Sequence, residues 1–193
     1  MDPRWAKACV LAGAIVMIAI RAPHGQRSLA VKVARSRKGT LETVLLTLAW
    51  LGFFVPIAWI ASPVFDCADF PLRPAPFAAG AACIAAGLWM FHRSHADLGT
   101  NWSITLEVRE GHRLVTSGIY GLVRHPMYLA LLLYAAGQAL VAPNWIAGPA
   151  YAVPLVLIVA CRLGPEERMM REEFGAEYEA YARRTRRLIP GIW

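Results

Sequence analysis

The chain has 193 residues, of which 57% are apolar and only 17% are charged. Soluble domains carry about 25% charged residues, so this composition excludes an ordinary soluble domain. The net charge is +7, and the basic residues lie between apolar blocks rather than among exposed aromatic residues. This arrangement argues against a nucleic-acid partner and favours a membrane protein with basic loops. Four cysteines lie far apart without a CxxC pair, so neither a disulfide framework nor a zinc site is indicated.

Five apolar blocks follow one another along the chain. They span residues 5–20, 41–61, 75–91, 127–142 and 145–163. We therefore predict an all-α integral membrane bundle of about five transmembrane helices, forming one domain over residues 1–193. Its N-terminal spans lie in residues 1–91 and its cofactor-binding and catalytic region in residues 92–193. A Rossmann domain is not expected, because no GxGxxG motif follows a strand.

Three of these blocks have features that shape the predicted bundle. The first is short for a bilayer crossing, which needs about 17–25 residues. The third is rich in glycine and alanine, and small residues let membrane helices approach each other closely. Only residues 143–144 separate the last two blocks, which predicts a tight antiparallel hairpin.

The basic residues alternate between the two sides of the predicted bundle. Seventeen of the 20 Lys and Arg residues lie in segments 21–38, 93–124 and 162–187, and the other three lie on the opposite side. The positive-inside rule then places the N-terminus outside and the C-terminus in the cytoplasm. The compact form and the basic loops favour a bacterial inner membrane.

The tail after the last block is predicted to form an amphipathic helix. Residues 164–165, Gly-Pro, are expected to end the fifth span and to start this helix, with two acids in its first turn. Met170, Phe174, Tyr178 and Tyr181 then recur at spacings of 4, 4 and 3 as an apolar stripe. The stripe fits a helix on the membrane surface and equally a lid over a site.

The segment 112–128 is the densest in functional side chains, and the fourth apolar block begins at its end. Within it lie HxLVTSGxY at residues 112–120 and RHPxY at 124–128, and after the hairpin come RxxxEE at 162–167 and FGxEYxxY at 174–181. In this order and spacing, the four motifs resemble the isoprenylcysteine carboxyl methyltransferase family and, more distantly, the phospholipid methyltransferases. The resemblance covers roughly residues 102–190.

The resemblance implies methyl transfer from S-adenosyl-L-methionine, with S-adenosyl-L-homocysteine as product, to a lipophilic, prenylcysteine-like carboxylate at the cytoplasmic membrane face. Arg162 would bind the acceptor carboxylate, and Arg162 and Glu166 are the catalytic candidates. One departure is that a cofactor-contacting Gln of the family falls at Thr105 here. The cofactor-binding candidates are His112, Leu114, Val115, Tyr120, His125, Pro126, Met127, Tyr128, Glu166 and Glu167.

The chemistry of the cofactor leads to the same region. S-adenosylmethionine carries a sulfonium, an ammonium, a carboxylate and a flat adenine, so its site needs an acid, aromatic faces and hydrogen-bond donors. Glu166 or Glu167 supplies the acid, and the rings come from Tyr120, Tyr128, Tyr178 and His125. A carboxylate acceptor is already ionised at neutral pH, so the enzyme needs alignment and exclusion of water rather than a general base.

Each of these residues also has a purely structural interpretation. Arg162 and Arg124 are placed where membrane proteins anchor headgroups, and the two acids are placed where helices prefer negative charge. His125-Pro126 is a normal start for a helix. His92 and His95, with Asp97, have the spacing of a metal pair, but we expect packing at the membrane interface and no metal.

Other functions stay open at this point. A sterol-reductase-like enzyme would share RHPxY and need NADPH, and a related methyltransferase would act on a phospholipid amine or a small thiol. A non-catalytic scaffold would bind lipid through the basic loops. The expected partners are the lipid bilayer and a lipophilic small-molecule or prenylated acceptor, with the oligomeric state undetermined.

Overall fold

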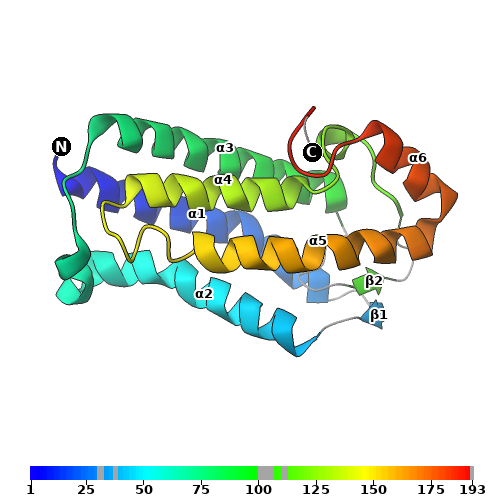
Figure 1. Cartoon of the computed structure of the whole chain (residues 1–193), viewed down its shortest axis with the longest axis horizontal. Helices are drawn as coiled ribbons and strands as arrows, with labels where there is room; N and C mark the ends of the chain where they lie inside the picture. The colour runs from blue at the N-terminus through cyan, green and yellow to red at the C-terminus, as the bar shows by residue number, and fades with distance from the viewer. Residues whose placement is uncertain (30–32, 37–38, 100–106, 110–112, 192–193) are drawn as a thin grey trace.

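The computed structural model describes residues 1–29, 33–36, 39–99, 107–109 and 113–191. Five long helices alternate in direction along one axis, so that the N-terminus lies at one end of the bundle and the tail at the other (Figure 1). They are α1 Pro3–Leu29, α2 Thr40–Ala61, α3 Pro74–Leu98, α4 Pro126–Val141 and α5 Ala152–Phe174. The predicted α-helical membrane bundle is confirmed.

Among the residues that the structure describes, three helices are long and apolar enough to cross a bilayer: residues 3–25 of α1, all of α2 and all of α3. The first is longer than its predicted block, because the helix continues past Arg21 and Pro23. Helix α4 is apolar but has only 16 residues, and α5 has 23 residues with charged side chains in its second half. The chain is therefore a multi-pass membrane protein.

Helices α3 and α4 pack with their backbones nearly in contact. A Cβ atom on Gly80 would lie 2.7 Å from the carbonyl oxygen of Gly137, and one on Gly137 would lie 2.6 Å from that of Gly80. Farther along, a Cβ atom on Gly87 would lie 2.8 Å from the carbonyl oxygen of Ala130. The prediction of close approach through small residues is confirmed for this pair. The contact fixes the start of α4 beside the end of α3.

The last two spans run antiparallel as predicted, but the prediction of a tight connection between them is wrong. Helix α4 ends at Val141 and α5 begins at Ala152, and the intervening loop is organised by Asn144. Its side chain donates to Asp69 Oδ1 at 2.6 Å and to the Phe65 carbonyl at 2.7 Å. It also accepts from the Ala147 amide at 2.7 Å. These contacts tie the loop to the 3-10 helix η1 Pro63–Ala68 and its C-cap, an interaction that local turn signals do not encode.

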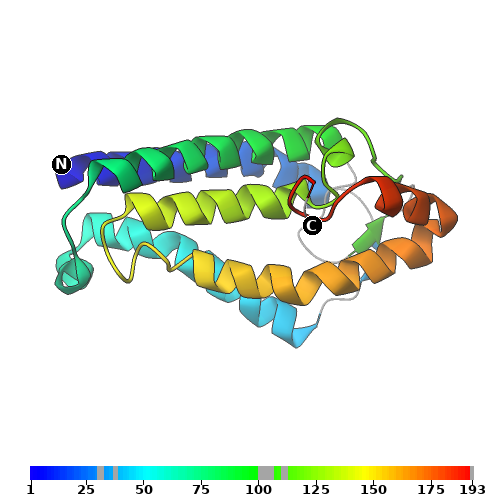
Figure 2. The same ribbon diagram turned by 45° about the horizontal axis from the view of Figure 1, so that its top comes forward.

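The predicted break at residues 164–165 is also wrong. Helix α5 runs through Pro165 to Phe174, and the chain turns only at Gly175, whose φ of +51° favours glycine. Helix α6, Ala176–Arg184, then folds back toward the start of α4 (Figure 2). A proline inside a long helix removes one hydrogen bond, whereas left-handed backbone ends the helix outright. The predicted apolar stripe is thus divided between two helices.

The described strands form one short antiparallel ribbon at the tail end of the bundle. Strand β1, Val33–Ser36, pairs with β2, Glu107–Arg109. The ribbon joins the segment after α1 to the segment after α3, and a 3-10 helix, η3 Gly118–Gly121, follows. Within the described residues there is no parallel sheet that would hold a nucleotide in the Rossmann manner.

Candidate functional site

A cavity of about 250 Å³ lies where the tail folds back on the bundle. Because the helices run along one axis, its lining divides into two ends. The polar end carries Arg113, Tyr120, His125, Tyr128, Glu166 and Tyr178. The apolar end reaches into the bundle between α1, α2, α4 and α5 and carries Met17, Trp50, Phe53, Leu131, Leu155 and Ile158. Arg162 also lines the cavity, one helical turn before Glu166 on α5.

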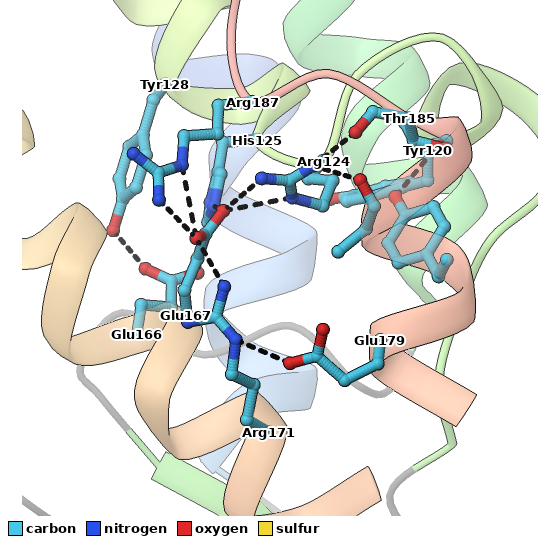
Figure 3. Close-up of polar contacts among 12 residues, drawn as sticks. Tyr120, Arg124, His125, Tyr128, Glu166, Glu167, Arg171, Glu179, Thr185 and Arg187 are labelled. Carbon is cyan, nitrogen blue, oxygen red and sulfur yellow. Dashed lines mark hydrogen bonds and ion pairs between the residues drawn. The ribbon is translucent and has the colours of Figure 1, made fainter. Parts of the chain in front are cut away.

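Tyr128 and Glu166 meet at the polar end although 38 positions separate them in the chain. The Tyr128 hydroxyl donates to Glu166 Oε2 at 2.5 Å (Figure 3). The other oxygen of Glu166 lies 3.7 Å from His125 Nδ1, and the His125 and Tyr128 rings are stacked with centroids 5.6 Å apart. The segment before the hairpin and the segment after it therefore build one pocket.

The neighbouring acid, Glu167, has a different environment. Its side chain is 1% exposed, and Arg124 donates to Oε1 through Nη2 at 2.7 Å and through Nε at 2.9 Å. Arg187 approaches Oε2 at 3.0 Å and Arg171 approaches the same oxygen at 3.4 Å, while His125 Nε2 lies 3.5 Å from Oε1. Four basic side chains thus converge on this carboxylate behind the cavity (Figure 3).

The same arginine holds the tail over the site. Arg124 Nη1 donates to the carbonyl oxygens of Ala182 and Thr185, and its backbone amide donates to Arg186 at 2.7 Å. On α6, the Tyr181 hydroxyl donates to the Tyr120 carbonyl at 2.6 Å. Tyr178 and Tyr181 are buried and line the cavity. These contacts favour the lid interpretation of the tail over a helix lying free on the membrane surface.

The polar end keeps its charges because they are paired. Burial alone would raise the pKa of Glu166, but its pairing with His125 and Tyr128 holds that pKa below the usual value. Burial would likewise raise the pKa of Glu167, and His125 and Arg124 lower it. Burial would lower the pKa of His125, and the two acids raise it above 6.5. The pairing therefore favours ionised carboxylates and a protonated imidazole at this end of the cavity.

This pairing makes the stability of the protein depend on pH. The folded pKa of His125 lies above its ordinary value of 6.5, so its stabilisation is complete below about pH 6.5 and is lost as pH rises through the folded pKa. The two acids do not change over this range, since their contribution is lost only at acid pH. We expect the unfolding temperature of wild type to exceed that of His125→Gln most near pH 6, with the difference shrinking toward pH 9.

The size of this change follows from general relations. Each unit of pKa difference corresponds to about 1.4 kcal/mol, and a protein of this length loses about 2–4 °C per kcal/mol. Thermal unfolding of both proteins in the same detergent between about pH 6 and pH 9 measures the effect. A difference that is constant or grows with pH would show that the imidazolium pair does not stabilise the fold.

Arg162 lies between the two ends of the cavity. Its side chain is 11% exposed, with Nη2 3.6 Å from Glu42 Oε1 on α2 and the guanidinium 6.0 Å from the centre of the Tyr128 ring. The position suits a residue that binds an acceptor headgroup where the polar and apolar ends meet. Glu42 was not among the predicted site residues. The one feature of the sequence that could have indicated it is the presence of an acid at the start of an apolar block.

Most predicted cofactor-binding residues line this cavity: Leu114, Val115, Tyr120, His125, Pro126, Met127, Tyr128 and Glu166. Glu167 lies behind the cavity in the arginine cluster, so a direct cofactor contact by it stays a prediction. His112 and Thr105 lie outside the described residues. Two features were not predicted from the sequence: the structural role of Arg124, and the contribution of α1 and α2 to the lining of the cavity.

His95 and Asp97 serve the packing of α3 in the structure, whereas His92 is exposed. Asp97 accepts from the Ile119 amide at 2.8 Å and from Arg93 at 3.1 Å. His95 Nδ1 lies 2.9 Å from the Phe91 carbonyl oxygen. Across the described parts of the chain, no group of three or more His, Cys, Asp or Glu is placed to hold a metal ion.

Comparison with known proteins bears on this cavity directly. The sequence pattern described as "Phospholipid methyltransferase" matches residues 75–177, which is more than half of the chain. The chain belongs to the phospholipid methyltransferase family. The family implies a methyl donor, and the matched segment contains α3, α4 and α5 with the polar end of the cavity. Helices α1 and α2, which line much of the apolar end, precede it.

Several proteins of similar sequence carry a more specific name. The chain is 34% identical over 89 residues to "Probable protein-S-isoprenylcysteine O-methyltransferase" of Oryza sativa subsp. indica, covering 46% of this chain and 47% of that protein. It is 33% identical over 96 residues to "Protein-S-isoprenylcysteine O-methyltransferase B" of Arabidopsis thaliana, covering 49% of each. The human protein of this name is 32% identical over 96 residues, 49% of this chain and 34% of that one. The chain spans about half the length of the first two relatives, and the predicted family resemblance is confirmed.

Proposed function

We propose that this protein transfers a methyl group from S-adenosylmethionine to a lipophilic acceptor that carries a carboxylate, of the prenylcysteine type. The observation that carries the proposal is one cavity that joins a charged, tyrosine-rich end to an apolar end inside a membrane bundle. A soluble, charged methyl donor and a greasy acceptor need such a pair of adjoining environments. The names of the plant and human relatives support this substrate class.

The residues of the polar end fit the methyl donor by their chemistry. Glu166 supplies negative charge for the donor's cationic groups, and Tyr128, Tyr120 and Tyr178 supply aromatic faces. When bound, the donor supplies a methyl group activated on a sulfonium. His125 holds Glu166 ionised and in place, while Arg124 and Glu167 fix the tail that closes the pocket.

On the acceptor side, Arg162 would bind the carboxylate and the apolar end would hold the hydrocarbon chain. Phe53, Leu131 and Ile158 offer lipid-like contacts along that end. An ionised carboxylate attacks without a general base, so the protein contributes alignment of the two reactants and exclusion of water. We assign Arg162 and Glu166 as the residues that touch acceptor and donor.

We also infer that the site faces the cytoplasm. The described parts of the segments richest in Lys and Arg lie at the tail end of the bundle, opposite the N-terminus (Figure 1). By the positive-inside rule this end is cytoplasmic, where a soluble methyl donor is available. A bacterial inner membrane stays a prediction, and the relatives named above are eukaryotic.

Calorimetry on the purified protein in detergent tests the function. Wild type is expected to bind S-adenosylhomocysteine, and His125→Ala to bind it at least about tenfold more weakly, because Glu166 loses its imidazolium partner. Radiolabelled methyl transfer to an N-acetyl-S-prenylcysteine, with phosphatidylethanolamine as the alternative acceptor, identifies the substrate class. Absence of S-adenosylhomocysteine binding would refute the proposal. Stabilisation of the protein by NADPH instead would favour the reductase interpretation.

A further inference from the structure

One ion pair joins a residue outside the segment matched by the family, Glu42, to the proposed acceptor-binding residue Arg162. Glu42 lies in the first turn of α2, is 9% exposed, and places Oε1 3.6 Å from Arg162 Nη2. That oxygen accepts no hydrogen bond from any described residue. A buried carboxylate on an otherwise apolar, membrane-spanning helix is costly, so its position against Arg162 requires a reason.

The Glu42–Arg162 pair lies between two cavities, and this location suggests a reason for the buried charge. Arg162 and Ile158 line the main cavity and also a second cavity of about 200 Å³ between the start of α2 and α5. Glu42 lines the second cavity together with Leu41 and Cys161, which are exposed on the outer face of the bundle. The Glu42–Arg162 pair therefore stands between the inner cavity and a gap that reaches the outside of the bundle.

The geometry of this pair differs sharply from that of the buried Arg124–Glu167 pair. Arg124 donates to Glu167 at 2.7 and 2.9 Å, and Arg187 adds a further donor, so that carboxylate is fully engaged. The Glu42–Arg162 pair is a single approach at 3.6 Å with an unsatisfied oxygen. Charge-assisted hydrogen bonds normally lie at about 2.7–2.9 Å. The Glu42 pair compensates charge without locking the two side chains together, so it can be exchanged.

We propose that Glu42 is the resting counter-ion of Arg162 and that the carboxylate of the acceptor displaces it on binding. A guanidinium in this setting is stabilised by nearby negative charge when the acceptor is absent, and Glu42 supplies such a charge at 3.6 Å. When a second carboxylate arrives, like charges repel, so one of the two must give way. Glu42 therefore competes with the acceptor carboxylate for Arg162, whereas an uncharged headgroup does not enter this competition.

The test compares two ligands that differ only in charge: an N-acetyl-S-prenylcysteine and its carboxamide. Binding of each to full-length wild type and Glu42→Gln is measured by calorimetry in lipid nanodiscs. Because two charges about 4 Å apart interact by several kcal/mol near a protein surface, we expect Glu42→Gln to bind the carboxylate at least about fivefold more tightly. Binding of the carboxamide and of S-adenosylhomocysteine should stay as in wild type.

Two variants control for misfolding and for unspecific charge effects. Glu42→Asp keeps the negative charge and should restore weaker carboxylate binding, and Glu177→Gln removes an exposed charge on α6, away from the cavity lining. Unchanged or weaker carboxylate binding by Glu42→Gln would overturn the inference. The inference rests on the proposed function, whose own failure is distinct: wild type would then neither bind S-adenosylhomocysteine nor methylate the carboxylate.

Discussion

Glu166→Gln is expected to weaken binding of S-adenosylhomocysteine by about 10- to 100-fold, because hydrogen bonds to charged groups contribute about 1.5–3 kcal/mol. The carboxylate faces the cavity, accepts from Tyr128 at 2.5 Å and is kept ionised by its pairing with His125 and Tyr128. The amide is nearly the same size but carries no charge, so it cannot balance the ammonium of the ligand. Calorimetry in detergent at neutral pH measures the loss.

The matched control is Glu177→Gln, the same substitution at an exposed position on α6 that does not line the cavity. It should bind the ligand as wild type does. Thermal unfolding of each variant shows whether the fold is retained, which separates a lost contact from a lost structure. If folded Glu166→Gln binds with wild-type affinity, the polar end of the cavity is not the cofactor site.

Arg124→Ala is expected to lower the free energy of unfolding by about 3–5 kcal/mol, the usual cost of removing one partner of a buried ion pair. The change leaves Glu167 without its closest donor and frees the carbonyls of Ala182 and Thr185. Since these contacts hold the segment after α6 against the start of α4, we expect the tail to open. Cofactor binding should fall with it, because Tyr178 and Tyr181 line the pocket from α6.

Limited proteolysis and thermal unfolding together measure this second effect. Cleavage within residues 175–191 should become much faster in Arg124→Ala, while the helices of the bundle stay protected. Arg124→Lys should give an intermediate result, because an ammonium cannot reproduce the several directed donors of a guanidinium. Arg183→Ala, at an exposed position on α6, is the control. A tail equally protected in Arg124→Ala and wild type would contradict the assigned role.

The two adjacent acids show how one motif divides into two roles. Glu167 is enclosed by Arg124, Arg187 and Arg171 and holds the tail in place. Glu166, one position earlier, points toward Tyr128 and the cavity, and His125 lies beside both acids. Successive residues of a helix are turned by about 100°, so they face different neighbours. The arginine cluster around Glu167 holds the tail, and Glu166, which faces the cavity, can therefore contact a ligand.

The apolar blocks in the sequence predicted the five long helices, because the hydrophobicity of a span is a property of consecutive residues, and their limits are nearly correct for α2 and α4. The four spaced motifs predicted the family and the residues of the polar end, because each motif supplies a short piece of backbone with its side chains. Tyr128 and Glu166, both predicted to bind the cofactor, meet in the structure.

The tertiary structure decided the rest, because it depends on which distant elements come together. The fifth helix continues past Pro165 and turns at Gly175, which places the tail over the cavity. The pairing of Glu42 with Arg162 joins the first half of the chain to the last. A charge in a sequence indicates that a partner is needed, and only the packing of α2 against α5 determines which partner it finds.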